Sequence, residues 1–322
     1  MKAPWITYRP ELKVLDCTIR DGGLINDHQW DEKFVKAVYQ TCVEAGIDYM
    51  EIGYKASKKL FARDKFGDWK FCDEDDLRRV VGDNETDVKL AVMADADKCD
   101  YKEDILPKDE SVIDVVRVAT YVHQIPTAVA MINDAYDKGY EVTCNLMAVS
   151  TVQEPDLDQA LEVLAASPAS TIVVVDSFGS LYAEQIEILV KKYKSYLNGT
   201  GKEVGIHAHN NQQLAFANTI EAIIHGANRI DATMGGLGRG AGNCPMELLI
   251  GFLRNPKFRL RPILKLLQDH VEPMRKAVEW GPMVPYIITG QLNQHPRSAI
   301  KMLSGNGRNN FVEFYDTCVA DE

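Results

Sequence analysis

The sequence predicts an α/β fold, a (β/α)8 TIM barrel that is followed by a small C-terminal helical appendage. Eight short apolar runs alternate with amphipathic stretches between residues 13 and 234. This alternation is typical of parallel βα units, and eight such units favour a closed barrel over an open sheet. We therefore expect a barrel domain over residues 1–255 and a helical region over residues 256–322.

Each predicted strand is a short run of apolar residues that ends in polar ones. The predicted strands cover residues 13–20, 48–53, 88–94, 115–120, 141–148, 171–176, 203–207 and 229–234. The segments between them carry apolar residues at helical spacing, and two of them end at a glycine. The predicted helices cover residues 34–44, 125–138, 157–166, 182–197 and 214–224, and in the tail 265–278 and 299–303.

Composition narrows the class of protein. The chain has 322 residues, a net charge of −11 and a pI near 5.2, which argue against binding to nucleic acid or to an anionic membrane. The seven cysteines are scattered without a C-x-x-C pair, as expected for reduced thiols in a cytoplasmic protein. We see no apolar signal core at the N-terminus and no segment with the length of a membrane span.

Active sites of TIM barrels lie at the carboxyl ends of the strands. In this sequence those ends are polar. A strand places residues i and i+2 on one face, so His207 and His209 point the same way. We expect these residues, with Asp21 and Asn243 from adjacent strand ends, to bind a divalent metal ion, Mn²⁺ or Mg²⁺. Four such ligands would leave two positions for a 2-oxo acid. The alternative for the histidine pair is two hydrogen-bonded polar residues at a strand end.

Several motifs give the chain a resemblance to a known family. They are Asp16-Cys-Thr-Ile-Arg-Asp-Gly22, Glu51, His207-x-His209 and Gly236-x-Gly-x-Gly-x-Gly-Asn243. Together they resemble the DRE-TIM metallolyase superfamily over about residues 13–255. The run from His207 to Asn218, Arg117-Val-Ala-Thr120 and His28-Gln29 resemble its 4-hydroxy-2-oxovalerate aldolase branch. The glycine loop lacks the catalytic cysteine of the lyase branch, and Cys244 is interpreted as a small buried residue.

The resemblance implies a metal-dependent aldolase that acts on a 4-hydroxy-2-oxo acid through a pyruvate-type enolate. The guanidinium group of Arg20 would donate hydrogen bonds to the substrate carboxylate or to the enolate oxygen, and Glu51 would orient that group. An internal salt bridge to Glu51 is the alternative role of Arg20. Substrate binding is expected from Arg20, Ser177, Arg117 and Asn145, although Ser177 could equally cap its strand.

One position departs from the aldolase branch, which places a base histidine three residues after the metal-binding aspartate. This chain has Leu24 there. Proton transfer would then fall to Tyr286, to His28 or to a metal-bound water. Tyr286 could instead pack the tail on the barrel, and His28 could bond to backbone at a helix start. The spacing does not decide whether Asn293, His295 and Arg297 face the substrate.

Two other functions compete with the aldolase. One is a Claisen-type synthase that joins an acyl-CoA to a 2-oxo acid, and the other is a catalytically altered metal-binding barrel. The expected partner is a small 2-oxo acid. A homodimer is expected, and the resemblance also suggests an acylating aldehyde dehydrogenase docked on the C-terminal helices.

Overall fold

A computed structural model describes residues 9–320 as a closed barrel of eight parallel strands in chain order, with β1 paired to both β2 and β8. The predicted TIM-barrel fold is confirmed. The strands are β1 (Lys13–Asp16), β2 (Tyr49–Tyr54), β3 (Lys89–Asp95), β4 (Val115–Thr120), β5 (Glu141–Leu146), β6 (Thr171–Asp176), β7 (Glu203–Ala208) and β8 (Arg229–Ala232).

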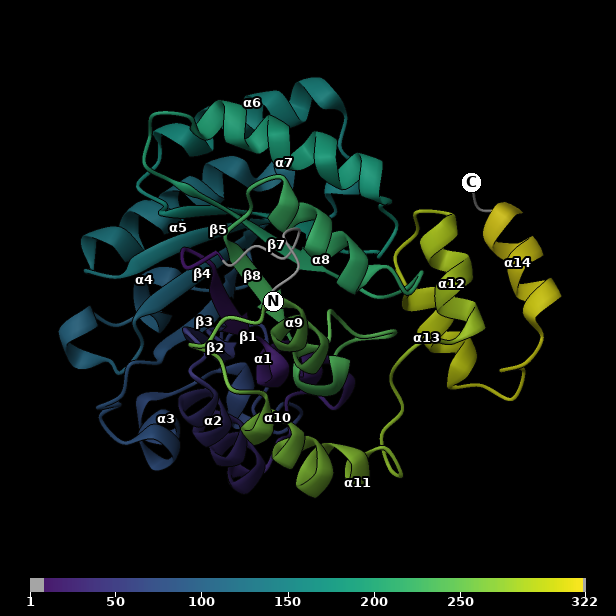
Figure 1. Ribbon diagram of the computed structural model, residues 1–322, viewed down its shortest axis with the longest axis horizontal. Helices are drawn as coiled ribbons and strands as arrows, with labels where there is room; N and C mark the ends of the chain where they lie inside the picture. The colour runs from purple at the N-terminus through teal and green to yellow at the C-terminus, as the bar shows by residue number, and fades with distance from the viewer. Residues whose placement is uncertain (1–8, 321–322) are drawn as a thin grey trace, which may run out of the picture.

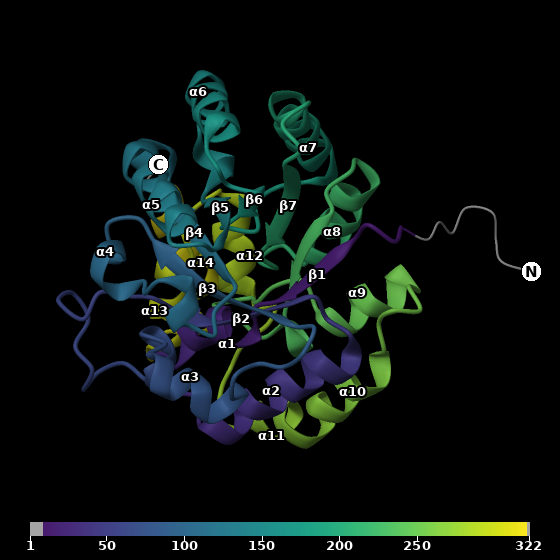
Figure 2. The ribbon, with the colours of Figure 1, turned by 90° about the vertical axis from the view of Figure 1, so that its left-hand side faces the viewer.

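The helices that lie between the strands and directly after β8 surround the barrel, as Figure 2 shows. They are α2 (Glu32–Ala45), α3 (Glu74–Val81), α4 (Tyr101–Asp104), α5 (Ile125–Asp137), α6 (Glu154–Ala166), α7 (Ala183–Leu197), α8 (Ala215–Ile224), α9 (Met246–Leu253) and α10 (Leu260–Leu266). The helix α2 shows both local signals of a helix boundary. The Asp31 side chain accepts from the Phe34 N–H at its start, and Gly46 ends it with a positive φ of 72°.

The first predicted strand is wrong in its second half. The strand β1 stops at Asp16, and residues Thr18–Gly22 form the short helix α1. The buried Asp16 carboxylate accepts from the Thr18 hydroxyl at 2.5 Å and from the Thr18 N–H at 3.2 Å, a local bond that ends the strand. Arg20 and Asp21 therefore lie on a helical turn above β1 and not on the strand itself.

The predicted tail helix over residues 265–278 is also broken. The chain forms α10, then a π-helical turn (Leu267–Val271), then the short α11 (Glu272–Met274). The helix α10 packs against α2, beside the barrel (Figure 1). The helices α3 and α9 were not predicted, because each is only eight residues long.

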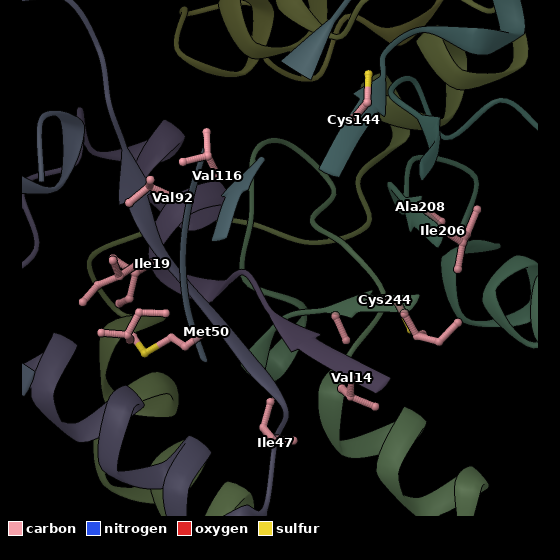
Figure 3. Packing of buried hydrophobic residues seen from close by; sticks show 14 of the residues in the cluster. Val14, Ile19, Ile47, Met50, Val92, Val116, Cys144, Ile206, Ala208 and Cys244 are labelled. Atoms are coloured by element: carbon pink, nitrogen blue, oxygen red, sulfur yellow. The ribbon is translucent and has the colours of Figure 1, made fainter. Parts of the chain in front are cut away.

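The apolar core lies between the strands and the helices. Residues at alternate strand positions point outward into it, among them Val14, Met50, Val92, Val116 and Ile206 (Figure 3). All five are fully or almost fully buried. Since successive strand residues face opposite sides, the positions between them point into the barrel.

The barrel interior is unusually polar. At the amino ends of the strands, Arg229 pairs with Glu141 at 2.5 Å and also with Glu203, and its guanidinium lies over the Tyr49 ring at 4.4 Å. One layer higher, the buried Arg117 contacts both Glu51 and Asp231, which are also buried. Charged side chains therefore fill space that branched apolar residues fill in most TIM barrels.

The tail forms three helices, α12 (Val284–Gln291), α13 (Arg297–Leu303) and α14 (Phe311–Ala320). They stand apart from the helical ring, in yellow in Figure 1. Asn293 donates to the Ser150 carbonyl at 2.9 Å, which ties the tail to the loop after β5 and thus to the carboxyl end of the barrel. The division of the chain at residue 255 stays a prediction. Among the residues described, no helix is long and apolar enough to cross a membrane.

Replacing Arg229 by leucine should lower the unfolding free energy by about 2 kcal/mol at pH 7, since it leaves two half-buried carboxylates, Glu141 and Glu203, short of a cation. Burial raises the pKa of Glu141 and Glu203, but their cationic partners lower it overall. The contribution of Arg229 to the unfolding free energy is thus complete above the ordinary glutamate pKa. It is lost as the pH falls through the lowered pKa values of the two glutamates in the folded protein. Urea unfolding of both proteins at pH 7 and in acid measures it.

Lys13→Leu is the matched control. It removes a more exposed cation from the same Glu203, with 38% of the Lys13 side chain accessible, and should cost about 1 kcal/mol or less. Equal losses for the two variants would contradict the importance of the buried pairing.

Candidate functional site

A cavity of about 140 Å³ opens at the carboxyl ends of the strands. The structure brings six of the predicted site residues together in its lining: Arg20, Asp21, Asn145, Ser177, His207 and His209. They come from α1 and from the ends of β5, β6 and β7. This is the end of a TIM barrel at which active sites form.

Asp21, His207 and His209 form a compact buried cluster at the base of this cavity. Asp21 Oδ2 lies 3.6 Å from His207 Nε2 and 3.9 Å from His209 Nε2. One ligand atom from each residue lies within 4.8 Å of the others. His207 Nε2 has no hydrogen-bond partner and is buried, so a cation between the three side chains would satisfy a group that otherwise costs free energy. The donor set fits a divalent metal ion.

Asn243 lies beside the cluster in a tightly packed glycine loop. Its Nδ2 donates to Asp21 Oδ1 at 3.0 Å, while its Oδ1 is buried without a partner. A Cβ on Gly238 would lie 2.1 Å from that Nδ2 and 2.7 Å from Asp21 Oδ1, so only glycine fits there. As oriented, the amide nitrogen and not the oxygen faces Asp21. The oxygen would face a cation after a half-turn of the amide.

A chain of buried ion pairs runs from the cluster into the barrel. Asp21 Oδ2 accepts from Arg20 Nη1 at 2.6 Å, and Arg20 Nε donates to Glu51 Oε2 at 2.7 Å. The same Glu51 oxygen lies 2.9 Å from Arg117 Nη1. Arg20, Glu51 and Arg117 are each at most 4% exposed, so these contacts are shielded from water.

The series of buried contacts closes into a ring through Asp231 of β8. Arg117 Nη2 donates to Asp231 Oδ2 at 2.5 Å, and the same oxygen lies 3.0 Å from His207 Nδ1. His207 Nε2 then faces Asp21, which completes a ring of six side chains. Because Asp231 is hydrogen-bonded to Nδ1 of His207, Nε2 of His207 is free and faces Asp21 and His209. This is the usual arrangement around a metal-binding histidine.

The charge states of Asp21 and His209 suit a cation site. Burial raises the pKa of Asp21, but Arg20 and the two histidines lower it well below its ordinary value, so this carboxylate is charged. Burial also lowers the pKa of His209 well below its ordinary value, so this imidazole is neutral. An ionised carboxylate and a neutral imidazole are the forms that bind metals.

The predicted substrate-binding residues differ in how they face the cavity. Arg20 uses Nε and Nη1 inside the ring, so its fork is occupied and only Nη2 is left, buried and without a partner. Ser177 Oγ accepts from the Ala148 N–H at 2.8 Å, which leaves its own proton free. Asn145 Oδ1 is buried and has no partner. Arg117 does not line the cavity, since it lies deeper, between Glu51 and Asp231.

The two predicted proton carriers lie outside the cavity lining. His28 is buried under Gly23 and packs edge-on against the Tyr54 ring, with 5.2 Å between ring centroids. Burial, helped by nearby cations, lowers its pKa to about 3. Tyr286 contacts Gly240 and belongs to a small apolar cluster that joins the tail to the glycine loop. Its position is that of the packing alternative.

The lining also contains thirteen residues outside the predicted site. They are Leu24, Tyr54, Met93, Asp95, Lys98, Ala119, Tyr121, Met147, Val175, Phe178, Arg239, His295 and Arg297, of which only Leu24, His295 and Arg297 had been considered. Asp231, outside the lining, was missed as well. The signal for Asp231 was present, since Arg229 and Asp231 alternate with apolar residues in β8.

A larger cavity of about 820 Å³ lies between α5 and α6. Tyr121 and Met147 line both cavities. The larger cavity is lined mainly by apolar side chains. It lacks the cluster of Asp21, His207 and His209, called the metal-type cluster below, so its size does not make it the reactive centre.

Comparisons with known proteins agree with this geometry. The 4-hydroxy-2-oxovalerate aldolase of Bacillus cereus is 28% identical over 285 residues, which are 85% of this chain and 80% of the relative. The crystal structure of the N-terminal domain of a Bacteroides vulgatus protein described as a candidate aldolase is 27% identical, with a TM-score of 0.79, and covers 94% of this chain and all of that domain.

HMG-CoA lyase from Bacillus subtilis is 18% identical, with a TM-score of 0.66 over 83% of this chain and 95% of that one, and shares the fold. The model of the HMGL-like family matches residues 11–268, which span all eight strands and the whole ring of charges. The chain therefore belongs to the HMGL-like family, as the resemblance to the DRE-TIM metallolyases predicted.

Proposed function

We propose that this protein is a divalent-metal-dependent carbon–carbon lyase that cleaves a 4-hydroxy-2-oxo acid into pyruvate and an aldehyde. The observation that carries the proposal is the cluster of Asp21, His207 and His209, which opens on the same cavity as the free Nη2 of Arg20. The family and the names of the aldolase relatives support the reaction class.

Asp21, His207 and His209 would hold the metal ion, with Asn243 as a fourth ligand after rotation of its amide. A mixed set of carboxylate, imidazole and amide oxygen favours Mn²⁺ or Mg²⁺ over a structural zinc ion. When bound, such an ion acts as a Lewis acid toward the 2-oxo group of the substrate. Arg239 supports the ligand set, because its backbone N–H donates to Asp21 Oδ1 at 3.1 Å.

The remaining groups would bind the oxo acid. Arg20 Nη2 donates to the oxygen on which negative charge develops as the bond between C3 and C4 breaks. The Ser177 hydroxyl and the Asn145 amide donate to the substrate carboxylate. Glu51 and Arg117 are positioning residues, since they hold Arg20 and Asp231 and do not line the cavity.

His295 is our candidate for the proton acceptor that Leu24 does not supply. It comes from the tail, lines the cavity and is half-buried. Burial and the nearby Arg239, Arg297 and Lys98 lower its pKa to about 4, so the imidazole is neutral near pH 7 and can accept a proton. Once the contacts of the imidazole with Arg239 and with the Arg297 N–H open, His295 Nε2 would take the proton of the C4 hydroxyl. The electrons of the broken bond pass to the pyruvate enolate, which then gains a proton at C3.

The assembly and the place of the enzyme in the cell belong to the proposal too. We expect a cytoplasmic enzyme that forms a homodimer or docks an acylating aldehyde dehydrogenase. An apolar stripe on α14 supports either contact, with exposed fractions of 76% for Val312, 47% for Tyr315 and 40% for Val319. Sedimentation of the full chain, alone and with such a dehydrogenase, distinguishes the two.

The purified protein with Mn²⁺ should release pyruvate from 4-hydroxy-2-oxopentanoate or a homologue without CoA, and EDTA should abolish the release. A panel of 4-hydroxy-2-oxo acids, read with lactate dehydrogenase and NADH, measures it. Leu24→His serves as a comparison, because it restores the imidazole of the aldolase branch. Activity in Leu24→His alone would count against the native aldolase. Release of CoA from an acyl-CoA and a 2-oxo acid would favour the synthase instead.

His295→Gln should lower kcat by about a hundredfold, the usual contribution of general acid–base catalysis, with little change in Mn²⁺ affinity. The double variant His295→Gln/Leu24→His should recover part of the rate, because it returns an imidazole to the same cavity. Tyr286→Phe, a control on the same tail, should stay within about twofold of native. A normal rate in His295→Gln would remove His295 from the reaction.

A further inference from the structure

Three cationic side chains from separate parts of the chain line the outer part of the cavity. Lys98 follows β3, Arg239 lies in the glycine loop after β8, and Arg297 begins α13. Lys98 and Arg297 are exposed and Arg239 is half-buried, whereas the metal-type cluster is buried. These three residues, called the cationic mouth below, therefore lie between the cluster and solvent.

His295 shows that the three cations converge. Arg239 Nη1 lies 3.3 Å from His295 Nε2, and the Arg297 backbone N–H donates to His295 Nδ1 at 3.2 Å. After burial, Arg239, Arg297 and Lys98 are the groups that lower the pKa of this imidazole. Their fields therefore overlap at one point on the cavity wall.

The cationic mouth has more positive charge than its neighbours neutralise. Lys98 pairs with Asp95 at 3.0 Å. Within residues 9–320, neither Arg239 nor Arg297 has a carboxylate at ion-pair distance, and Arg239 Nε is buried without a partner. The other carboxylate in the lining, Asp21, is taken by Arg20. Uncompensated guanidinium groups at a cavity, in a chain of net charge −11, indicate an anionic ligand.

We propose that the cationic mouth binds a second anionic group, a carboxylate or a phosphate, on the aldehyde part of the substrate. The inference rests on the proposed function, which assigns the oxo-acid end to the inner residues. The aldehyde half of the molecule must then extend toward the mouth. The preferred substrate is thus a 4-hydroxy-2-oxo acid that carries a negative charge at its far end.

The larger apolar cavity offers the competing arrangement. Tyr121 and Met147 line it and the reactive cavity alike, so an alkyl chain could pass between them. An enzyme built that way would prefer long apolar aldehydes. The contrast between charged and apolar aldehydes therefore tests the proposal directly.

The test uses the condensation direction, in which pyruvate C3 loses a proton and bonds to the aldehyde carbon, and the aldehyde oxygen gains a proton. Butanal and succinic semialdehyde have the same carbon count and differ in a terminal methyl or carboxylate. With Mn²⁺ and pyruvate, kcat/KM for succinic semialdehyde should exceed that for butanal by about tenfold or more. Glyceraldehyde 3-phosphate against glyceraldehyde distinguishes phosphate from carboxylate, and hexanal tests the apolar arrangement.

Variants locate the effect. In Arg297→Ala and in Lys98→Met, the ratio of kcat/KM for the charged aldehyde to kcat/KM for the neutral one should fall severalfold. Added salt should lower the same ratio in the native enzyme. Lys301→Ala, which removes another exposed cation of α13 outside the cavity lining, should keep the native ratio. A preference for butanal or hexanal, or a ratio unchanged in both Arg297→Ala and Lys98→Met, would overturn the proposal.

Exchange of the pyruvate C3 protons in D2O, followed by NMR with Mn²⁺, separates this inference from the proposed function. The exchange needs only the oxo-acid end of the site. Exchange together with no preference for charged aldehydes would overturn the cationic mouth and leave the lyase standing. The absence of exchange, with no condensation of any aldehyde, would overturn both.

Discussion

The ring of buried charges through the barrel is the constraint on which the rest of the site depends. Each member of this ring contacts the next, from Asp21 through Arg20 and Glu51 to Arg117, and back through Asp231 and His207. Buried ion pairs add little to stability, because desolvation offsets their attraction, but breaking one is expensive. Such a ring therefore fixes geometry more than it stabilises the fold. It holds two neighbouring side chains of the cavity, Arg20 and His207, in one orientation each.

The ring also sets the charge that a ligand meets. It contains three carboxylates and two guanidinium groups. Burial lowers the pKa of His207, but its contacts with Asp21 and Asp231 raise it above its ordinary value overall. When His207 gives up its proton to bind a metal ion, the ring is left with one negative charge in excess beside the cavity. That excess sits where Asp21 faces His207 and His209, which favours a cation there. The mouth of the same cavity carries the opposite sign. A substrate with one end on the metal and a negative charge at the other end would match both.

The sequence predicted the parts of this site that follow from periodicity. Alternation of apolar runs predicted the barrel, and the i, i+2 spacing of His207 and His209 predicted a shared face. The turn at Thr18 was not predictable in this way, because the bond between Asp16 and Thr18 ends an apolar run that would otherwise continue as a strand. The alternation of residues in β8 could have placed Asp231 inside the barrel, but its contact with His207 joins residues far apart in sequence, as does the contact of His295 with Arg239. No local pattern contains such contacts.

The central claim is that Asp231 orients His207 for metal binding, and the Mn²⁺ affinity of Asp231→Asn tests it most directly. Titration calorimetry should show affinity about 10- to 100-fold weaker than native, the usual effect of losing a carboxylate behind a metal-binding histidine. Asp95→Asn, which removes a carboxylate from the same cavity without touching His207, should bind close to native. Native affinity in Asp231→Asn, or equal weakening in both variants, would contradict the claim.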